Sequence, residues 1–320
     1  MATTTDTVRP VASKRKVPRR PGDLAFSGTA LAAGITILVV LAAVAIFLAI
    51  ESIPAFTGEP AENPILKGES FWAYVGPLVF GTIWASLLAL LMAAPLAIGI
   101  ALFISHYAPK RIASFLGYII DLLAAVPSVV FGLWGGVTFA GMVQPFYAWL
   151  NEYFSWIPLF SGQVSATGRT ILTAAMVLAI MVLPIMTAIC REIFLQTPKL
   201  HEEAALALGA TRWEMIRMAV LPFARGGMVS SAMLALGRAL GETMAVTMVL
   251  SVSGVVTFEL LTATNPTTIP ANIALSFPEA YGDGVSVLIA TGLVLFVLTF
   301  AVNALARWIV SRRSEFSGAN

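Results

Sequence analysis

The sequence predicts an all-α polytopic membrane protein. Hydrophobic residues make up 58% of the 320 residues and charged residues only 11%, whereas a typical soluble domain carries about 25% charged residues. The charges are clustered, so they leave six long apolar stretches between them. Lysine and arginine also fall almost entirely in alternate loops, which is the pattern of a chain that crosses a membrane repeatedly.

Each of the six apolar stretches is long enough to form a membrane-spanning helix, which needs about 20 mostly apolar residues. None shows the alternation of polar and apolar residues that is typical of a β-barrel strand. The first stretch follows a basic segment, but its apolar run is too long for a secretory signal, so we expect a retained helix. The six predicted helices cover residues 27–50, 76–104, 115–138, 170–190, 228–250 and 285–309.

The orientation follows from the basic residues, which concentrate on the cytoplasmic side of membrane proteins. The loops on the opposite side hold only Lys67. Six helices with both termini in the cytoplasm fit this distribution, and we expect the basic tail 1–26 to be disordered and 313–320 to form a C-terminal tail. The predicted cytoplasmic segments, with 16 of the 19 basic residues, are the N-terminal tail, 105–114, 191–227 and the C-terminus; the predicted outer loops are 51–74, 139–168 and 251–284.

Several function classes are excluded by what the sequence lacks. Cys190 is the single cysteine, so no intramolecular disulfide and no paired-cysteine metal motif can form. His106 and His201 lie far apart in sequence, and we expect no metal site. No lysine follows a glycine, so the phosphate-binding loop of nucleotide-hydrolysing proteins is missing. We therefore expect a non-catalytic subunit that binds no cofactor, and nucleic acid is not an expected partner.

The outer loops are acidic, with eight acidic residues and one basic residue, a net charge of −7. A pore that collected free anions would be expected to have a positive mouth, because focused fields raise the local concentration of counter-ions. An anion would therefore be delivered more readily by a separate binding protein than by electrostatic steering.

Ionisable residues within the predicted helices are candidates for a translocation path, because a charge within the bilayer is costly and by default functional. Arg238 and Glu242 lie four residues apart in the predicted helix 228–250, on one helical face. They form either an internal ion pair or part of a water-filled path for an anion, and Asp121 is a third candidate. Gly237 and Gly241 would allow a neighbouring helix to approach closely, either within this chain or at an oligomer interface.

The loop 191–227 predicts a helix, a glycine turn and a second helix, over about 200–208, Gly209 and 211–222. Such an elbow is either a docking surface for a soluble partner or a solvated loop that lies on lipid. Charged side chains keep it in water, and an apolar face is formed by Leu206, Leu208, Trp213 and Ile216.

Three motifs resemble one family. Glu203-Ala204-Ala205, followed by Gly209 and then Leu221-Pro222, resembles the coupling loop of ABC importer permeases, although Ala219 stands where that family usually has isoleucine. The segments 237–246 and 126–135 resemble the phosphate-specific permeases of the PstC type. The resemblance covers roughly residues 70–312.

The resemblance implies a type I ABC importer (MetI-like) permease fold over 70–312. It implies that Glu203, Ala204, Ala205, Gly209 and the Leu221-Pro222 pair couple this subunit to an ATPase. The implied partners are a second permease subunit that completes a heterodimer, two cytoplasmic ATPase subunits that hold ATP and Mg, and an external phosphate-binding protein. The implied function is import of inorganic phosphate across the cytoplasmic membrane.

Two rival functions remain from the sequence. One is an ABC permease for another oxyanion, sulfate or molybdate. The other is a self-sufficient secondary transporter in which Arg238, Glu242 and Asp121 form a proton relay. Under the phosphate reading, Arg238 meets the anion through its planar fork of donors. Glu242 either accepts the hydrogen bond of monohydrogen phosphate or only holds Arg238 in position.

Overall fold

The structure is a computed structural model that describes residues 21–58, 63–251 and 253–314. Residues 1–20 of the predicted tail 1–26 and residues 315–320 of the predicted tail 313–320 lie outside the described residues. The prediction that residues 1–20 are disordered therefore also lies outside the described residues. The chain divides into two compact units, Met1–Phe47 and Leu48–Asn320. The described part of the first unit is helix α1, Pro21–Glu51, which begins earlier than the predicted helix and continues past the unit boundary. Its 31 residues span about 46 Å at 1.5 Å per residue, which is enough to cross a bilayer.

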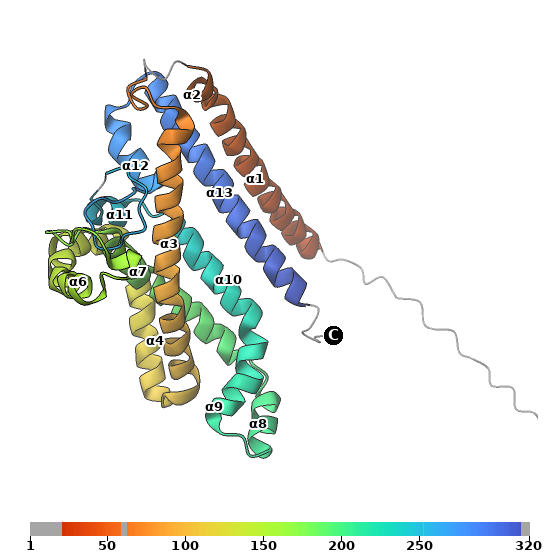
Figure 1. Ribbon diagram of the computed structural model, residues 1–320. Helices are drawn as coiled ribbons and strands as arrows, with labels where there is room; N and C mark the ends of the chain where they lie inside the picture. The colour runs from red at the N-terminus through yellow and green to blue at the C-terminus, as the bar shows by residue number, and fades with distance from the viewer. Residues whose placement is uncertain (1–20, 59–62, 252, 315–320) are drawn as a thin grey trace, which may run out of the picture. The chain divides into compact units, whose positions relative to one another are not determined.

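The second unit is helical almost throughout. The loops 105–114 and 191–227, both predicted to be cytoplasmic, lie at one end of it, and α2 and α12 lie at the other end (Figure 1). Its α-helices are α2 (Ile53–Thr57), α3 (Phe71–Leu102), α4 (Lys110–Ala124), α5 (Ser128–Trp134), α6 (Ala140–Phe154), α7 (Ile171–Leu195), α8 (Lys199–Ala207), α9 (Arg212–Met215), α10 (Leu221–Leu240), α11 (Met244–Val249), α12 (Ile269–Ser276) and α13 (Asp283–Ser314).

Six helices in the described part of the chain are long and apolar enough to cross a membrane, which confirms the predicted number. Four of them match the predicted stretches closely, whereas the third and the fifth have different bounds. The six are Ala25–Thr57, Phe71–Tyr107, Ser128–Phe154, Ile171–Leu195, Arg212–Leu240 and Asp283–Trp308.

The predicted third helix, 115–138, is wrong because the chain breaks within it. Helix α4 ends at Ala124, and α5 begins at Ser128 after the N-cap residue Pro127. Proline lacks a backbone N–H and disfavours the helical conformation of the residue before it, so a break at this point is the expected result. A π turn, Gly135–Phe139, joins α5 to α6, and this helix takes in part of the predicted outer loop 139–168.

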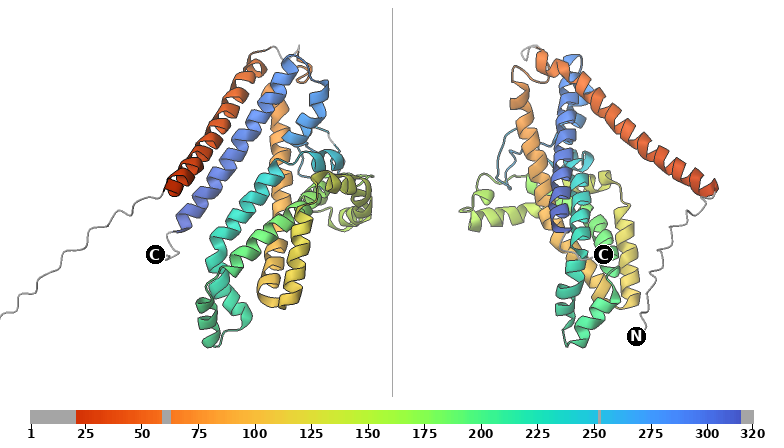
Figure 2. Two further views of the ribbon diagram at one scale, coloured as in Figure 1. Left: turned by 180° about the vertical axis from the view of Figure 1, so that it is seen from behind. Right: turned by 90° about the vertical axis from the view of Figure 1, so that its right-hand side faces the viewer.

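The predicted fifth helix, 228–250, is wrong at both ends. Helix α9, the π turn Ile216–Val220 and α10 form one continuous helix from Arg212 to Leu240 (Figure 2), which joins the predicted segment 211–222 to the membrane helix. The N–H of Leu221 bonds to the carbonyl of Ile216, so the widened turn accommodates Pro222, which has no N–H to donate. After Gly241 the chain leaves the helix and restarts as α11.

Helices α3 and α7 form the centre of the core (Figure 2). Fully buried alanines recur every fourth residue along α3, so they lie on one face of the helix and let its neighbours approach closely. Larger side chains of α7, such as Leu178 and Met186, are also fully buried in this cluster. The alanines are Ala85, Ala89, Ala93, Ala97 and Ala101.

Glycines let α5 and the π turn after it lie directly against α11. A Cβ at Gly132 would stand 2.7 Å from Cα of Ala245, and one at Gly136 would overlap the carbonyl of Met248. Backbone therefore meets backbone here, without side chains between the two segments. This close contact holds α11 in place immediately after the break at Gly241.

Replacing Gly136 by alanine is expected to lower the melting temperature of the purified protein, because overpacking of this kind costs about 1–3 kcal/mol. Gly141→Ala is the matched control, since a Cβ at Gly141 meets nothing within 4 Å. Thermal unfolding in detergent measures both. An equal melting temperature for the two variants would contradict the close contact.

Candidate functional site: the coupling elbow and the end of helix α10

The elbow predicted from the sequence is present between α8 and α9. Gly209 has a φ of +86°, a conformation that glycine adopts without steric cost. The N–H of Gly209 donates to the carbonyl of Leu206 at 3.0 Å, and that of Ala210 donates to Ala205 at 3.2 Å. These two bonds form the Schellman motif, which satisfies carbonyls at a helix end. The prediction that Gly209 makes the turn is confirmed.

The second arm of the elbow begins with a capping box. The N–H of Glu214 donates to Oγ1 of Thr211 at 3.3 Å, and Oε2 of Glu214 accepts from the N–H of Thr211 at 2.8 Å. Each side chain thus satisfies a backbone donor that the first turn leaves free. The elbow is a locally determined unit, with a defined stop for α8 and a defined start for α9.

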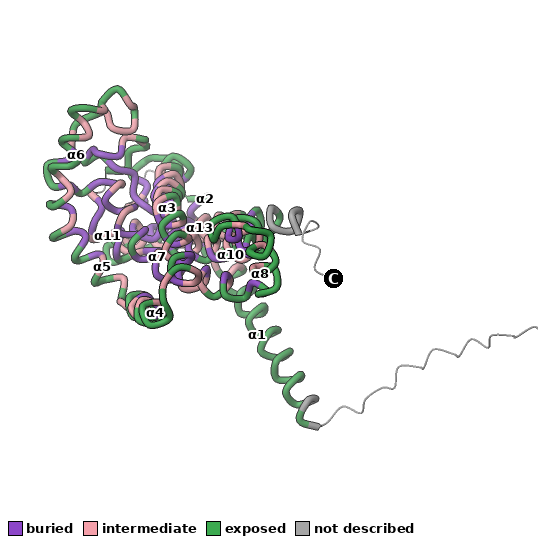
Figure 3. The backbone as a smooth tube through the Cα atoms, turned by 90° about the horizontal axis from the view of Figure 1, so that it is seen from below, coloured by how far each residue is buried: buried purple, intermediate pink, exposed green. Residues whose placement is uncertain are grey.

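Most of α8 is exposed (Figure 3). The elbow also exposes apolar side chains, as a docking surface would: Leu208 is 90% exposed, and Leu206 and Trp213 are exposed as well. Ile216, which we expected on the same face, is instead fully buried against the core. The predicted apolar face is therefore correct for three of its four residues.

The predicted coupling residues divide into an outer and an inner group. Glu203, Ala204 and Pro222 are exposed and free to meet a partner. Ala205 and Leu221 are partly buried and pack against the core of this chain. The second group therefore holds the elbow to the helices behind it.

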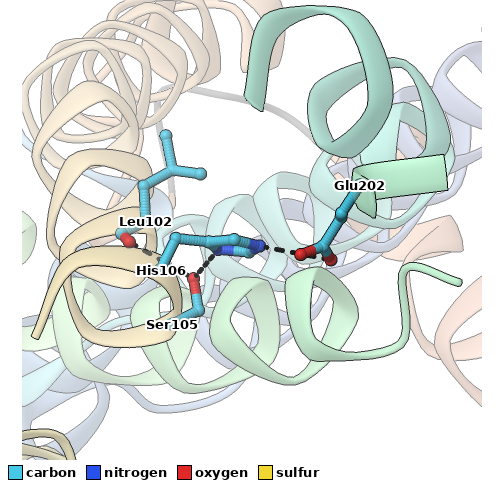
Figure 4. Close-up of polar contacts among 4 residues, drawn as sticks. All are labelled: Leu102, Ser105, His106 and Glu202. Atoms are coloured by element: carbon cyan, nitrogen blue, oxygen red, sulfur yellow. Dashed lines mark hydrogen bonds and ion pairs between the residues drawn. The ribbon is translucent and has the colours of Figure 1, made fainter. Parts of the chain in front are cut away.

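An ion pair also fixes α8 to the end of α3 (Figure 4). Nε2 of His106 lies 3.6 Å from Oε1 of Glu202, and the two side chains are 8% and 24% exposed. Oγ of Ser105 lies 2.7 Å from Nδ1 of His106 and donates to the carbonyl of Leu102 at 3.3 Å. Among the described residues this is the one ion pair. Sequence reasoning missed it, since nothing in the pattern connects residues so far apart in the chain.

The structure separates Arg238 from Glu242. Arg238 lies exposed in the last turn of α10, and Glu242 lies beyond the helix end, 9% exposed. Oε1 of Glu242 accepts a hydrogen bond from the N–H of Ala245 at 3.1 Å, so the carboxylate caps the start of α11. No ion pair joins Arg238 to Glu242 within the described chain. The expected position of the pair on one helical face is wrong, because the helix ends between them.

Asp121 is placed apart from these two residues. It is exposed on α4 and lines a cavity with Lys110 and Arg191, and neither Arg238 nor Glu242 lines that cavity. The structure therefore does not gather the three predicted path residues into one site.

Among the described residues, Gly237 and Gly241 pack against no other helix. A Cβ at Gly237 would meet nothing within 4 Å, and one at Gly241 would meet only carbonyls of its own helix, 3.6 Å away or more. Packing against a helix of the same chain is therefore not found for these two glycines among the described residues, and packing at an oligomer interface stays a prediction. Gly132 and Gly136 have that role instead.

The sequence profile of one protein family, described as "Binding-protein-dependent transport system inner membrane component", matches residues 93–315. The chain belongs to this family. The match covers the elbow and the end of α10, so the two candidate sites lie inside the family's own region. As a member of the family, with six helices long enough to span a bilayer, it is a multi-pass membrane permease.

Relatives from several bacteria extend over nearly the whole permease. The "Phosphate transport system permease protein PstC 2" of Mycobacterium tuberculosis is 45% identical over 303 residues, 91% of this chain and 93% of the relative. The "Phosphate transport system permease protein PstC" of Mesorhizobium japonicum is 40% identical over 313 residues, 93% of this chain and 92% of the relative.

A solved structure shares the fold of the permease. It is an inward-facing conformation of the MetNI methionine ABC transporter, which matches with a TM-score of 0.54 at 15% sequence identity over 76% of this chain and 98% of the other. The type I ABC importer (MetI-like) fold predicted from the sequence is confirmed.

Proposed function

We propose that this chain is the transmembrane permease subunit of an ATP-driven ABC importer that moves inorganic phosphate across the cytoplasmic membrane into the cell. The observation that carries the proposal is the identity of 40–45% with phosphate transport permeases over more than nine-tenths of the chain. Sulfate and molybdate remain the rival substrates.

The elbow formed by α8, Gly209 and α9 is the surface that we assign to an ATPase partner. Its exposed leucines and Trp213 offer an apolar contact, and Glu203 and Ala204 stand on the same exposed arm. In this assignment both termini and the elbow lie in the cytoplasm, and the acidic outer loops receive a phosphate-binding protein. ATP and Mg belong to two ATPase subunits, and this subunit performs no catalysis and holds no cofactor.

A second permease subunit completes the path in this proposal. Arg238 is exposed on α10, and a Cβ at the neighbouring Gly237 would meet nothing within 4 Å. A guanidinium within a bilayer needs water or a polar partner. A heterodimer interface supplies both, since an anion path between two subunits is wet and lined from both sides.

Reconstitution tests the proposed function. Proteoliposomes that contain this chain, the second permease and the ATPase, with the binding protein outside, are expected to take up phosphate only when ATP is present inside. The same liposomes with this chain alone and a proton gradient are expected to remain inactive. ATP-independent uptake by the chain alone would establish the secondary transporter instead, and faster sulfate than phosphate uptake would overturn the substrate.

Glu242 is proposed to help separate phosphate from sulfate. One carboxylate oxygen caps α11, and the other can accept the O–H of monohydrogen phosphate, which sulfate lacks. Glu242→Gln keeps an acceptor for the cap but loses the negative charge, so the ratio of phosphate to sulfate flux is expected to fall. The measurement uses a transporter variant that works without the binding protein.

Glu279→Gln is the control for this change, because Glu279 is exposed and lies outside the membrane helices. An unchanged flux ratio in the Glu242 variant would limit that residue to capping α11.

A further inference from the structure

A cavity of about 570 Å³ opens between α4, α7 and the turn that ends α3. Its volume falls within the range of sites for small ligands, about 300–1,000 Å³. It is distinct from the elbow and from the end of α10. Its polar lining includes Ser105, Lys110, Ser114, Tyr118, Asp121 and Arg191.

The charged residues that line the cavity form no ion pair with one another among the described residues. Lys110, Asp121 and Arg191 all line it, yet none of them forms an ion pair within the described chain. Nε of Arg191 is buried and has no hydrogen-bond partner. Buried polar groups are nearly always paired, and a bound water or ion is one explanation for a donor that the protein leaves unpaired. Two cations against one carboxylate give the cavity a net charge of +1, which favours an anion.

Gly117 provides the room for the Arg191 side chain. A Cβ at this position of α4 would overlap Nη1 of Arg191. The glycine therefore leaves room for the guanidinium next to the backbone of α4, where both residues line the cavity. The space at Gly117 is therefore occupied by the guanidinium of Arg191.

We propose that this cavity binds a tetrahedral phosphate group. Arg191 holds two of its oxygens with the guanidinium fork, and Lys110 adds a second positive charge. Asp121 then accepts a hydrogen bond from a donor on the same ligand. Inorganic phosphate offers its O–H for this contact, and an ethanolamine phospholipid offers its ammonium group.

The surroundings of the cavity fit both sources of a phosphate group. Phe115, Leu122 and Leu195 are exposed beside it, as side chains that meet lipid tails would be. Lys110 stands in the loop that we assign to the cytoplasmic side, where basic pockets between helices bind lipid headgroups. Imported phosphate would also leave the path on this side. The inference rests on the proposed orientation, and its test measures binding, so it can fail while phosphate transport stands.

The experiment uses the complete purified transporter in detergent. Inorganic phosphate is one probe and dihexanoyl phosphatidylethanolamine is the other, and each is titrated while tryptophan fluorescence or thermal stability is followed. Arg191→Gln is expected to weaken binding of at least one probe by about tenfold or more, because a hydrogen bond between charged groups is lost. Gly117→Ala is expected to lower the affinity for the same probe, since it displaces the guanidinium of Arg191 without changing any charge.

Two further variants keep the result interpretable. Arg217→Gln removes an exposed arginine outside the cavity, and it should leave both affinities unchanged. Lys110→Gln removes the second positive charge that lines the cavity. It should lower the affinity for the same probe, and it provides this test even if the Arg191 variant fails to fold.

The two probes separate the sources. An effect on inorganic phosphate alone assigns the cavity to the transported anion, and an effect on the phospholipid alone assigns it to a structural lipid. Unchanged affinities for both probes in the Lys110 and Gly117 variants would overturn the proposal.

Discussion

Replacing Gly209 by valine is expected to separate ATP hydrolysis from phosphate uptake. The backbone at Gly209 has a φ of +86°, and a residue with a Cβ pays roughly 1–2 kcal/mol in the left-handed region, with β-branched residues disfavoured further. This cost shifts the elbow about fivefold to thirtyfold away from its native turn. The Schellman bonds to Leu206 and Ala205 then weaken, and α8 no longer presents its arm to the ATPase.

The measurement compares ATP hydrolysis with phosphate uptake in the same proteoliposomes. Gly254→Val is the matched control, because Gly254 also has a positive φ, +68°, and open space around its Cβ position, but lies far from the elbow in the chain. It carries a comparable strain and should keep the two rates coupled. Normal uptake in the Gly209 variant would remove the elbow from the coupling mechanism.

Replacing Arg238 by alanine is expected to reduce phosphate uptake by about tenfold to a hundredfold or more, which corresponds to the loss of one hydrogen bond between charged groups. Arg238 lies in the last turn of α10, where the helix dipole favours a cation. Its side chain is exposed and forms no ion pair with described residues, so its charge is available to an anion. Arg238→Lys is expected to restore little of the phosphate uptake, since an ammonium group cannot form the planar two-point contact of a guanidinium.

Arg225→Ala provides the control on the same helix. Arg225 is exposed near the start of α10, and its removal should leave the uptake rate close to that of the native protein. The rate of phosphate uptake at saturating binding protein is the quantity to compare. Full uptake by Arg238→Ala would limit this residue to a structural role.

The number of spanning helices could be predicted from the sequence because it depends on a local quantity. Hydropathy over about 20 residues requires no knowledge of tertiary contacts, whereas the orientation inferred from lysine and arginine stays a prediction. The turn at Gly209 was equally local, since a glycine after an amphipathic run is a helix stop. These predictions agree with the number of spanning helices and with the elbow.

The errors in the helix bounds occur where a helix ends inside a long apolar stretch of sequence. Ser128 follows Pro127 and Glu242 follows Gly241, but the longer segments around both positions are largely apolar. Hydropathy averaged over about 20 residues therefore does not detect that α4 and α10 end there. The assumed continuity then placed Glu242 on the face of Arg238, whereas the carboxylate caps α11. The ion pair of His106 with Glu202 could not be foreseen, because it depends on how α3 and α8 meet.

The continuous helix from Arg212 to Leu240 has the elbow at one end and Arg238 near the other, so a tilt of this helix moves the two together. Arg238 lies 26 positions after Arg212, a distance of about 39 Å along the helix at 1.5 Å per residue. A tilt of about 10° around one end would carry the other end through about 7 Å, more than the height of one helical turn. If the elbow binds an ATPase as proposed, a small rotation at that surface would become a larger displacement at Arg238, enough to open or close the proposed path for phosphate.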